Sequence, residues 1–302
     1  MASTIPQTTN DNIRIIIASP LNPRYRIQPY ILNALSNSKI DTLHINEIFV
    51  IDSLSASAVL QQYAPGNLWM NRGNQIGMGK AVGIELNGTI TNNLFFHIDL
   101  FNHIFTNSPY SSHANYVPHH EFGHCYDHST RGEIISPPLL MPPDYFILER
   151  VHTYYLYIVK GELSACVFSG YAAFHGLVTR QLNVIDEHFD THFSLIDIND
   201  PFTLADFVWF VMSEFSKIVG YRIGNLSFNA IRLSRPSNVD SNVFDILIND
   251  FEVFLASQWS TYPAFNQEFN DGCIAIFHNI CNALGYRFVL DSAGDTLERI
   301  IP

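Results

Sequence analysis

The stretch with the clearest chemical meaning carries the motif HExxH, formed by His120, Glu121 and His124. In a helix, residues four apart share one face and are separated by about 6 Å along the axis, so both imidazoles can reach one ion. The glutamate between them then stands beside that ion, where it can accept a proton from a coordinated water. The motif therefore predicts a catalytic zinc site with Glu121 as general base.

A catalytic zinc site needs a third protein ligand and keeps one position open for water. The extended motif HExxHxxGxxH would require glycine at position 127 and histidine at position 130, whereas the chain has Asp127 and Thr130. The metzincin class, which uses that motif, is therefore excluded. Asp127 and His128 lie about two turns along the same helix, which closes a metal site poorly. Asp127 is better suited to bind a ligand imidazole or to fix a neighbouring loop.

Another candidate for the third ligand is Glu162, 38 residues after His124. Its neighbours Gly161, Ser164 and Ala165 are small and would let its helix approach the HExxH helix closely. An acidic residue in such a segment can equally be an ordinary surface residue. The spacing alone leaves both interpretations open.

Three other features near or after the motif have weaker claims to a function. His119 adjoins a ligand and so points to another side of the helix. His188 and His192 form a second pair at a spacing of four, but the pair lacks the glutamate of HExxH and fits an amphipathic helix. Cys125 is expected to face the core, since nothing near it in sequence would activate its thiol.

The segment after the motif adds a second pattern, Y-x6-E-x2-A-x2-F, in Tyr155, Glu162, Ala165 and Phe168. Together with the run HHEFGHCYDH at residues 119–128, it resembles the catalytic domain of anthrax lethal factor and the bacterial Pro-Pro endopeptidases. These are zincins of the gluzincin type. The resemblance covers residues 119–169.

The resemblance implies a zinc site and a role for each matching residue. It implies that zinc is bound by His120, His124 and Glu162, with Glu121 as general base. It also implies that the Tyr155 hydroxyl stabilises the oxyanion. Gly161 stands where the Pro-Pro endopeptidases carry a second acidic residue, which argues against their proline specificity here.

The helix geometry tests the role of Tyr155. On one continuous helix, Tyr155 and Glu162 share a face but lie about 10 Å apart along the axis. A break at Gly161 would bring them closer, so one continuous helix and two helices both remain open for this stretch. Tyr154, Tyr157 and His152 remain alternative donors.

The strands and helices around the motif are expected to form an α+β fold. Apolar or alternating runs predict strands at residues 13–18, 43–51, 81–86 and 94–100. Helices are expected at 29–36 and 55–63, and from residue 116 onward. Asn87-Gly88 is a hairpin signal between the last two strands, although the connection between the predicted strands is long. Sequence does not choose which of these two strands aligns a substrate.

The rest of the chain is expected to be mainly helical. Residues 144–175 have helical composition with Asp144 as a plausible N-cap, and amphipathic segments follow around 181–195, 203–219, 243–258 and 273–284. We therefore expect a zincin-like domain over 1–178, with a mixed sheet packed on the HExxH helix and on a Glu-bearing helix. A mainly helical region follows at 179–302, with a soft boundary.

Composition narrows the class of protein. The chain has 302 residues, of which 47% are hydrophobic and 15% charged, and a net charge of −12, so extensive disorder is excluded. The sequence has no run of Lys and Arg residues, so it does not indicate binding to nucleic acid. No signal peptide or membrane span is recognisable, so a cytoplasmic or non-classically secreted protein is expected. The 4 cysteines show no CxxC pair.

Together these features predict a zinc-dependent endopeptidase that hydrolyses a polypeptide substrate with one catalytic zinc ion. Two alternatives remain open. One is a catalytically silent binding module with the zincin fold, and the other is an effector or toxin protease exported without a signal peptide. Sequence sets neither the substrate nor the oligomeric state.

Overall fold

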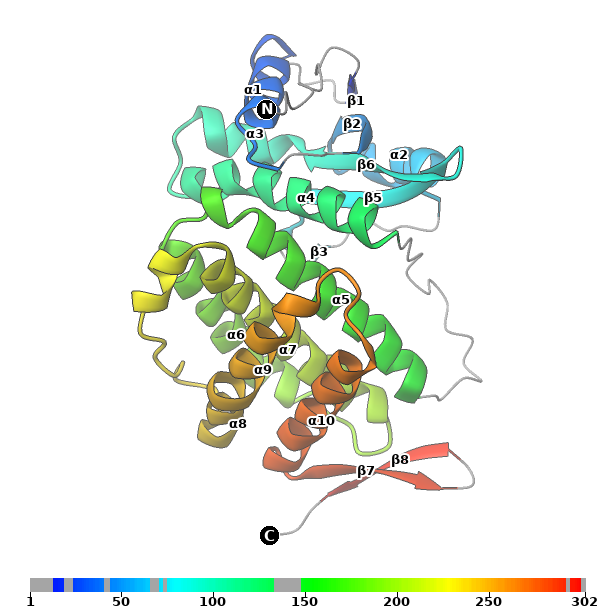
Figure 1. The fold of residues 1–302 in the computed structure, drawn as a ribbon, viewed down its shortest axis with the longest axis vertical. Helices are drawn as coiled ribbons and strands as arrows, with labels where there is room; N and C mark the ends of the chain where they lie inside the picture. Colours follow the sequence, from blue (N-terminus) through cyan, green and yellow to red (C-terminus); the bar gives the residue numbers. More distant parts are fainter. Residues whose placement is uncertain are drawn as a thin grey trace, which may run out of the picture. The chain divides into compact units, whose positions relative to one another are not determined.

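The structure is a computed structural model and describes residues 13–18, 24–40, 44–65, 71–72, 75–132, 148–291 and 294–299. The chain forms two compact units, Met1–Ser136 and Pro137–Pro302. The sequence placed a soft boundary near residue 178 instead. Helix α5 (Leu148–Phe168) packs against α7 (Pro201–Gly224), and this packing makes it part of the second unit. The fold class is α+β (Figure 1).

The first unit contains a mixed four-stranded sheet with the strand order β1-β2-β6-β5. Strands β1 (Arg14–Ala18), β2 (Ile45–Ile51) and β6 (Thr89–His97) are parallel, and β5 (Gly79–Leu86) pairs antiparallel with β6. All four predicted strands are present, although β6 begins earlier than residue 94 and ends at His97, since residues 98–100 belong to a helix. Short strands β3 (Asn71–Arg72) and β4 (Gln75–Ile76) form a separate antiparallel pair.

The hairpin between β5 and β6 corrects one expectation. Leu86 pairs with Thr89, so Asn87 and Gly88 alone make the turn, both with positive φ. Such a turn suits Asn-Gly, because glycine accepts this backbone region without strain. The connection between the predicted strands was long because residues 89–93 are mostly polar, so the hydrophobicity pattern did not indicate the start of β6.

Helices cover both faces of this sheet. On one face, Ile48 and Val50 of β2 join a core that includes residues of α1 (Arg24–Ser36), α3 (Ile98–Phe105) and α4 (Ser111–Arg131). On the other face, Phe49 and Ile51 pack with α2 (Ala56–Tyr63). Because successive strand residues face opposite sides, a strand segment covered on both faces is a continuous apolar run, as residues Ile48–Ile51 of β2 are.

The second unit is mainly helical, as expected. After α5 it contains α6 (Gly176–Phe193), α7, α8 (Ser241–Ile246), α9 (Glu252–Gln258) and α10 (Gln267–Ala283). A π-helical segment, Leu247–Phe251, joins α8 to α9, and short 3-10 turns lie at Gly170–Ala172, Leu226–Ala230 and Trp259–Thr261. A final hairpin of β7 (Tyr286–Asp291) and β8 (Gly294–Arg299) was not predicted.

Sequence left one helix or two open at Gly161, and the structure has one, because α5 runs without interruption from Leu148 to Phe168. A glycine costs a helix only about 1 kcal/mol, which tertiary packing can offset. Here α7 supplies that packing through Gly220 and Gly224. A Cβ on Gly220 would lie 2.7 Å from the carbonyl oxygen of Leu163 on α5, and one on Gly224 would lie 2.3 Å from that of Val167.

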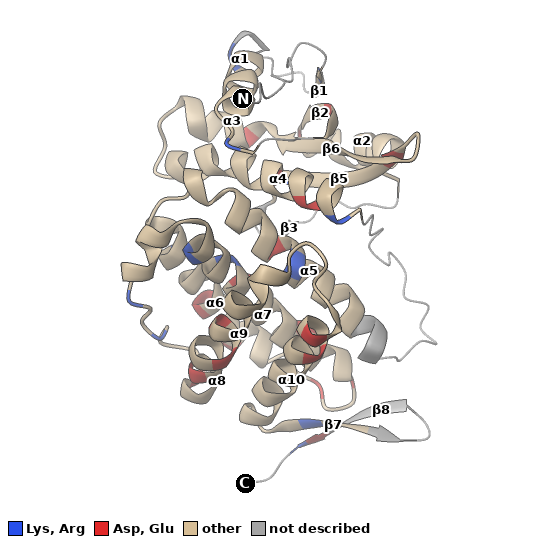
Figure 2. Cartoon of the chain, in the orientation of Figure 1, with Lys and Arg blue, Asp and Glu red and all other residues tan. Residues whose placement is uncertain are grey.

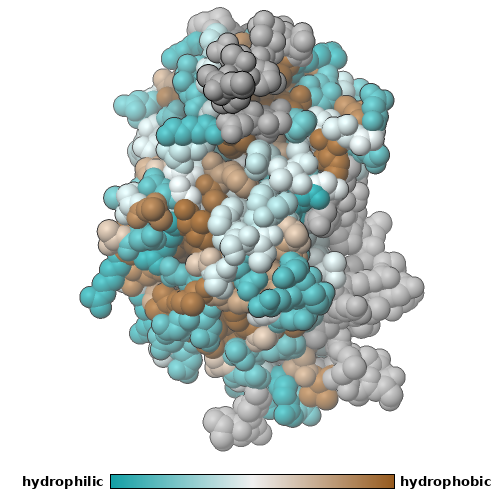
Figure 3. Space-filling model, viewed as in Figure 1, coloured by the Kyte–Doolittle hydropathy of each residue, from teal (hydrophilic) through white to brown (hydrophobic). Residues whose placement is uncertain are grey.

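One expectation, the N-cap at Asp144, falls outside the part of the chain that the structure describes. None of the described helices is both long enough and apolar enough to cross a membrane. Lys and Arg stand singly along the described elements in Figure 2. The face drawn in Figure 3 mixes hydrophobic with hydrophilic residues, which is ordinary for a folded surface.

Candidate metal centre

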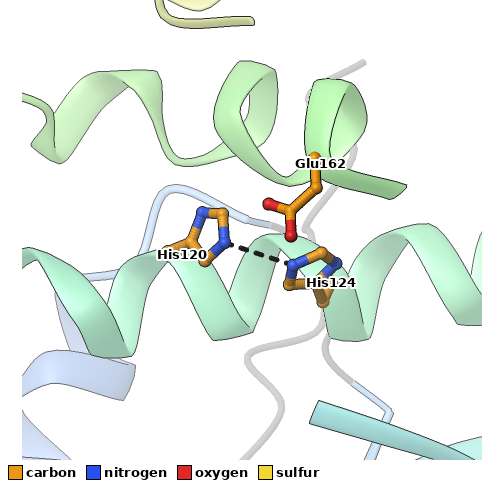
Figure 4. A group of neighbouring side chains, drawn as sticks. All are labelled: His120, His124 and Glu162. Atoms are coloured by element: carbon orange, nitrogen blue, oxygen red, sulfur yellow. Dashed lines mark hydrogen bonds between the residues drawn. The ribbon is translucent and has the colours of Figure 1, made fainter. Parts of the chain in front are cut away.

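Helix α4 holds His120 and His124 with their imidazoles turned toward each other (Figure 4). Their Nε2 atoms lie 3.2 Å apart, and both side chains are partly buried. Two nitrogen donors at 2.0–2.1 Å from a tetrahedral zinc ion would lie about 3.3 Å apart. The pair therefore has the separation that one zinc ion requires.

Glu121 lies on another side of the same helix and is 6% exposed. Its side chain passes over Gly79 at the start of strand β5, where a Cβ would come within 2.8 Å of Glu121 Cγ and 2.9 Å of Oε1. The absent side chain at Gly79 thus leaves room for the carboxylate. Sequence reasoning missed Gly79, since it began the strand at residue 81.

Small residues at alternate positions of β5 let α4 lie close to this edge strand. Gly79 faces Glu121, Gly83 faces His128, and Ala81 between them packs into the core shared with α4. Lys80, the residue after Gly79, interacts electrostatically with the Glu121 carboxylate. Burial lowers the pKa of the Lys80 ammonium group, and the negative charge of Glu121 opposes that shift.

The core-facing side of α4 confirms the expectation for Cys125. Its side chain is fully buried, and burial followed by the charge of Glu121 holds the pKa of the thiol well above its usual range. His119 meets Phe122 edge to face at 5.9 Å, and burial lowers the pKa of its imidazole. Neither side chain belongs to the pair that faces the ion site.

Asp127 and His128, the two same-helix alternatives for a third ligand, make other contacts. The buried Asp127 carboxylate accepts hydrogen bonds from Arg131 one turn later. His128 Nδ1 donates to Asn92 Oδ1 at 2.8 Å, and the Asn92 amide donates to the carbonyl oxygen of Cys125. Burial and the charge of Arg131 lower the pKa of His128 to about 3. The hydrogen bonds that Asn92 makes with His128 and Cys125 join α4 to strand β6.

Glu162 stands on α5 in the second unit, with its side chain 18% exposed. Among the described residues, one group of His, Cys, Asp or Glu side chains suits a metal ion: His120, His124 and Glu162 each offer a ligand atom within 4.8 Å of the others (Figure 4). Two imidazoles and a carboxylate are a donor set that zinc accepts.

Tyr155, also on α5, is engaged elsewhere. Its hydroxyl donates to Asp206 of α7, and its ring stacks on Trp209 at a centroid distance of 5.7 Å. Burial, followed by the Asp206 charge, raises the pKa of this phenol. The alternative donor Tyr154 is partly buried, and burial also raises its pKa, with Asp206 as the second cause.

His152, another alternative donor, lies in an aromatic cluster of the second unit. It is 6% exposed and meets Trp209, Phe277 and His278 at ring-centroid distances of 5.7, 4.9 and 5.7 Å. Burial, and then the neighbouring His278, lowers the pKa of His152 to about 4. His188 and His192 lie against Phe210 on α7, in agreement with an amphipathic helix α6.

A second constellation, unforeseen from sequence, consists of Ser53, His97 and Asp99. Ser53 Oγ lies 3.1 Å from His97 Nε2, and His97 Nδ1 lies 3.4 Å from Asp99 Oδ2, as in a catalytic triad. However, His97 Nδ1 caps α3 by accepting the backbone N–H of Asp99 at 3.3 Å. An accepting Nδ1 places the proton on Nε2, which then donates to Ser53 and cannot act as its base.

No family model, curated protein or solved structure matches the chain. The resemblance to lethal factor and the Pro-Pro endopeptidases therefore stays a prediction based on residues 119–169.

Proposed function

We propose that the chain is a zinc-dependent endopeptidase with a zincin-like catalytic site. The observation that carries this proposal is the arrangement on α4, where two imidazoles face one point and the glutamate between them is held against an edge strand. In a surface helix with incidental histidines, we would expect the glutamate to face solvent, whereas Glu121 is buried against a glycine. The donor set completed by Glu162 supports the same interpretation.

His120, His124 and Glu162 are the proposed ligands of one zinc ion. Bound there, zinc would act as a Lewis acid and bring the pKa of a coordinated water toward 7.

Glu121 is the proposed general base. Its carboxylate would accept a proton during attack on the peptide carbonyl and return it to the leaving amine. Because Glu121 lies over the first residue of β5, a substrate aligned along this strand would present its scissile bond beside the carboxylate. Of the two strands that sequence left open, β5 is at the edge of the sheet and β6 is internal.

Tyr155 is proposed to stabilise the oxyanion, as the resemblance implies. On the continuous helix α5, Tyr155 lies about 10 Å along the axis from Glu162. Because its hydroxyl is bonded to Asp206, it must release that carboxylate before it can bind the substrate. The absence of an acid at position 161 favours a specificity different from that of the Pro-Pro endopeptidases.

Peptide-library cleavage read by mass spectrometry tests the proposal. Zinc-loaded wild type should cleave a subset of peptides, and Glu121→Gln should retain the zinc while its cleavage rate falls at least about 100-fold. The conservative amide keeps the volume of the side chain, so metal content and melting temperature serve as controls.

Three results would count against the proposal in different ways. Equal cleavage by wild type and Glu121→Gln would remove the role of the base. A wild type that binds one zinc ion but cleaves nothing would support the binding-module alternative. A wild type without stoichiometric zinc would overturn the metal site itself.

A further inference from the structure

Lys217 on α7 lies between two carboxylates of the second unit. Its Nζ is 3.1 and 3.2 Å from the two oxygens of Glu214, three residues earlier on the same helix. On its other side, Nζ is 3.7 Å from Oε2 of Glu162, an ion-pair distance longer than a hydrogen bond. The ammonium group therefore lies within ion-pair distance of the proposed third zinc ligand.

The position of this ammonium group is set by buried contacts. The Glu214 side chain is 2% exposed, and Gln181 of α6 donates a hydrogen bond of 3.0 Å to its Oε2. A buried carboxylate must be paired, because burying an uncompensated charge is costly. Glu214 thus holds the ammonium group, which in turn lies within reach of Glu162.

The packing of α5 on α7 keeps the two partners close. Gly220, one turn after Lys217, approaches the backbone of α5 so closely that a Cβ would lie 2.7 Å from the Leu163 carbonyl oxygen. Leu163 directly follows Glu162. The distance between Lys217 and Glu162 therefore depends on a rigid helix contact and not only on two flexible side chains.

Resting on the proposed zinc site, we propose that Lys217 is a positioning residue that makes Glu162 a one-oxygen ligand. The ammonium group engages Oε2 and leaves Oε1 as the donor to the ion. A carboxylate that binds through one oxygen occupies one coordination position, which preserves the open position that a catalytic zinc site needs.

The charges allow a variant that separates positioning from electrostatics. Lys217, Glu214 and Glu162 together carry one net negative charge. Replacing Lys217→Met alone would leave Glu214 buried without its cation and make the site more negative. The double variant Glu214→Gln with Lys217→Met keeps the net charge at one negative and leaves an amide to bond Gln181.

The test compares cobalt-substituted proteins by visible absorption, alongside zinc affinity from chelator competition. The d–d bands of tetrahedral cobalt are stronger than those of five- or six-coordinate cobalt, because the tetrahedral field mixes the most p character into the d orbitals. In the double variant Glu162 can chelate through both oxygens, and the bands should weaken while zinc affinity is unchanged or tighter. The cleavage rate kcat should fall about 10- to 100-fold with little change in KM.

Two further variants complete the comparison. Glu214→Gln alone keeps Lys217 beside Glu162 and should keep the wild-type cobalt spectrum. Lys217→Arg restores a cation and should also keep it. Both should melt close to the wild type if folded correctly.

Each outcome decides something. An unchanged spectrum in the double variant overturns the positioning role and leaves the zinc site intact. Weaker zinc binding together with a lower melting temperature assigns Lys217 to helix packing, which also overturns it. A wild type that binds neither metal overturns the proposed function, and the role of Lys217 with it.

Discussion

The side chain of Glu121 occupies the space that a Cβ atom on Gly79 would need: the two would be 2.8 Å apart at Glu121 Cγ. Real Cβ atoms do not approach other carbons so closely, and Val117 Cγ1 would also lie 2.8 Å away, so any larger residue at position 79 must displace these side chains or the strand. The position of the proposed base thus depends on a residue 42 positions earlier, on the edge strand β5.

Replacing Gly79→Ala should therefore move Glu121 without removing the histidine pair. We expect a loss of stability of about 1–3 kcal/mol and a drop in kcat, with zinc content preserved. Steady-state cleavage, metal analysis and thermal melts measure the three effects.

Gly83→Ala is the matched control, because it adds the same methyl group to the same face of β5. Its Cβ would lie 3.5 Å from His128 Nδ1, an ordinary contact. Equal effects of the two alanines on kcat would show that Gly79 has no particular link to Glu121.

The hydroxyl of Tyr155 can be assigned by removing it. If it only bonds Asp206, Tyr155→Phe should cost about 0.5–1.5 kcal/mol of stability and leave turnover unchanged. If it stabilises the oxyanion, kcat should fall about 10²–10³-fold. We expect the second result, and Asp206→Asn, which removes the charge and keeps the shape, should leave kcat near the wild-type value. A Tyr155→Phe enzyme with wild-type kcat would pass the role to Tyr154, Tyr157 or another group.

The strands and the HExxH helix could be predicted because local pattern and tertiary structure agree there. Residues Ile48–Ile51 of β2 are all apolar since helices cover both faces of the strand, and Asn87-Gly88 specifies the turn between β5 and β6 by backbone conformation alone. The same agreement placed the helical segments of the second unit.

The failures arise where contacts distant in sequence decide the structure. Sequence left a helix break at Gly161 open, whereas α5 is continuous and packs closely against Gly220 and Gly224. The bond from Tyr155 to Asp206 spans 51 residues, and no local pattern reports it. Gly79 was missed because glycine and lysine do not announce a strand, although its lack of a side chain is what the site uses.

The contact between α5 and α7 gives a stability prediction for the second unit. A methyl group at Gly224 would lie 2.3 Å from the Val167 carbonyl oxygen, and backbone atoms cannot move aside as a flexible side chain can. Gly224→Ala should cost about 3 kcal/mol or more, visible as a lower midpoint in urea. Gly176→Ala, whose Cβ would meet the Phe174 ring at 2.8 Å, should cost less because that side chain can rotate. The reverse order would contradict the helix packing.

The buried His152 makes the second unit sensitive to acid. Its pKa of about 4 in the folded state lies below the ordinary 6.5, so folding favours the neutral imidazole. The stability that this provides is complete above pH 6.5 and is lost as the pH falls toward 4, because the unfolded state binds the proton first. Protonation would place a cation beside Trp209, Phe277 and His278, which is itself a base whose pKa burial lowers.

Urea unfolding at pH 7 and pH 4.5 measures the effect. The wild type should lose about 1–3 kcal/mol more than His152→Phe between these two values, since phenylalanine fits an aromatic cluster and does not titrate. The same difference should appear after the proposed zinc ligands His120 and His124 are replaced by alanine, because His152 acts within the second unit alone. Parallel losses in wild type and His152→Phe would mean that other groups, and not this buried imidazole, set the acid response.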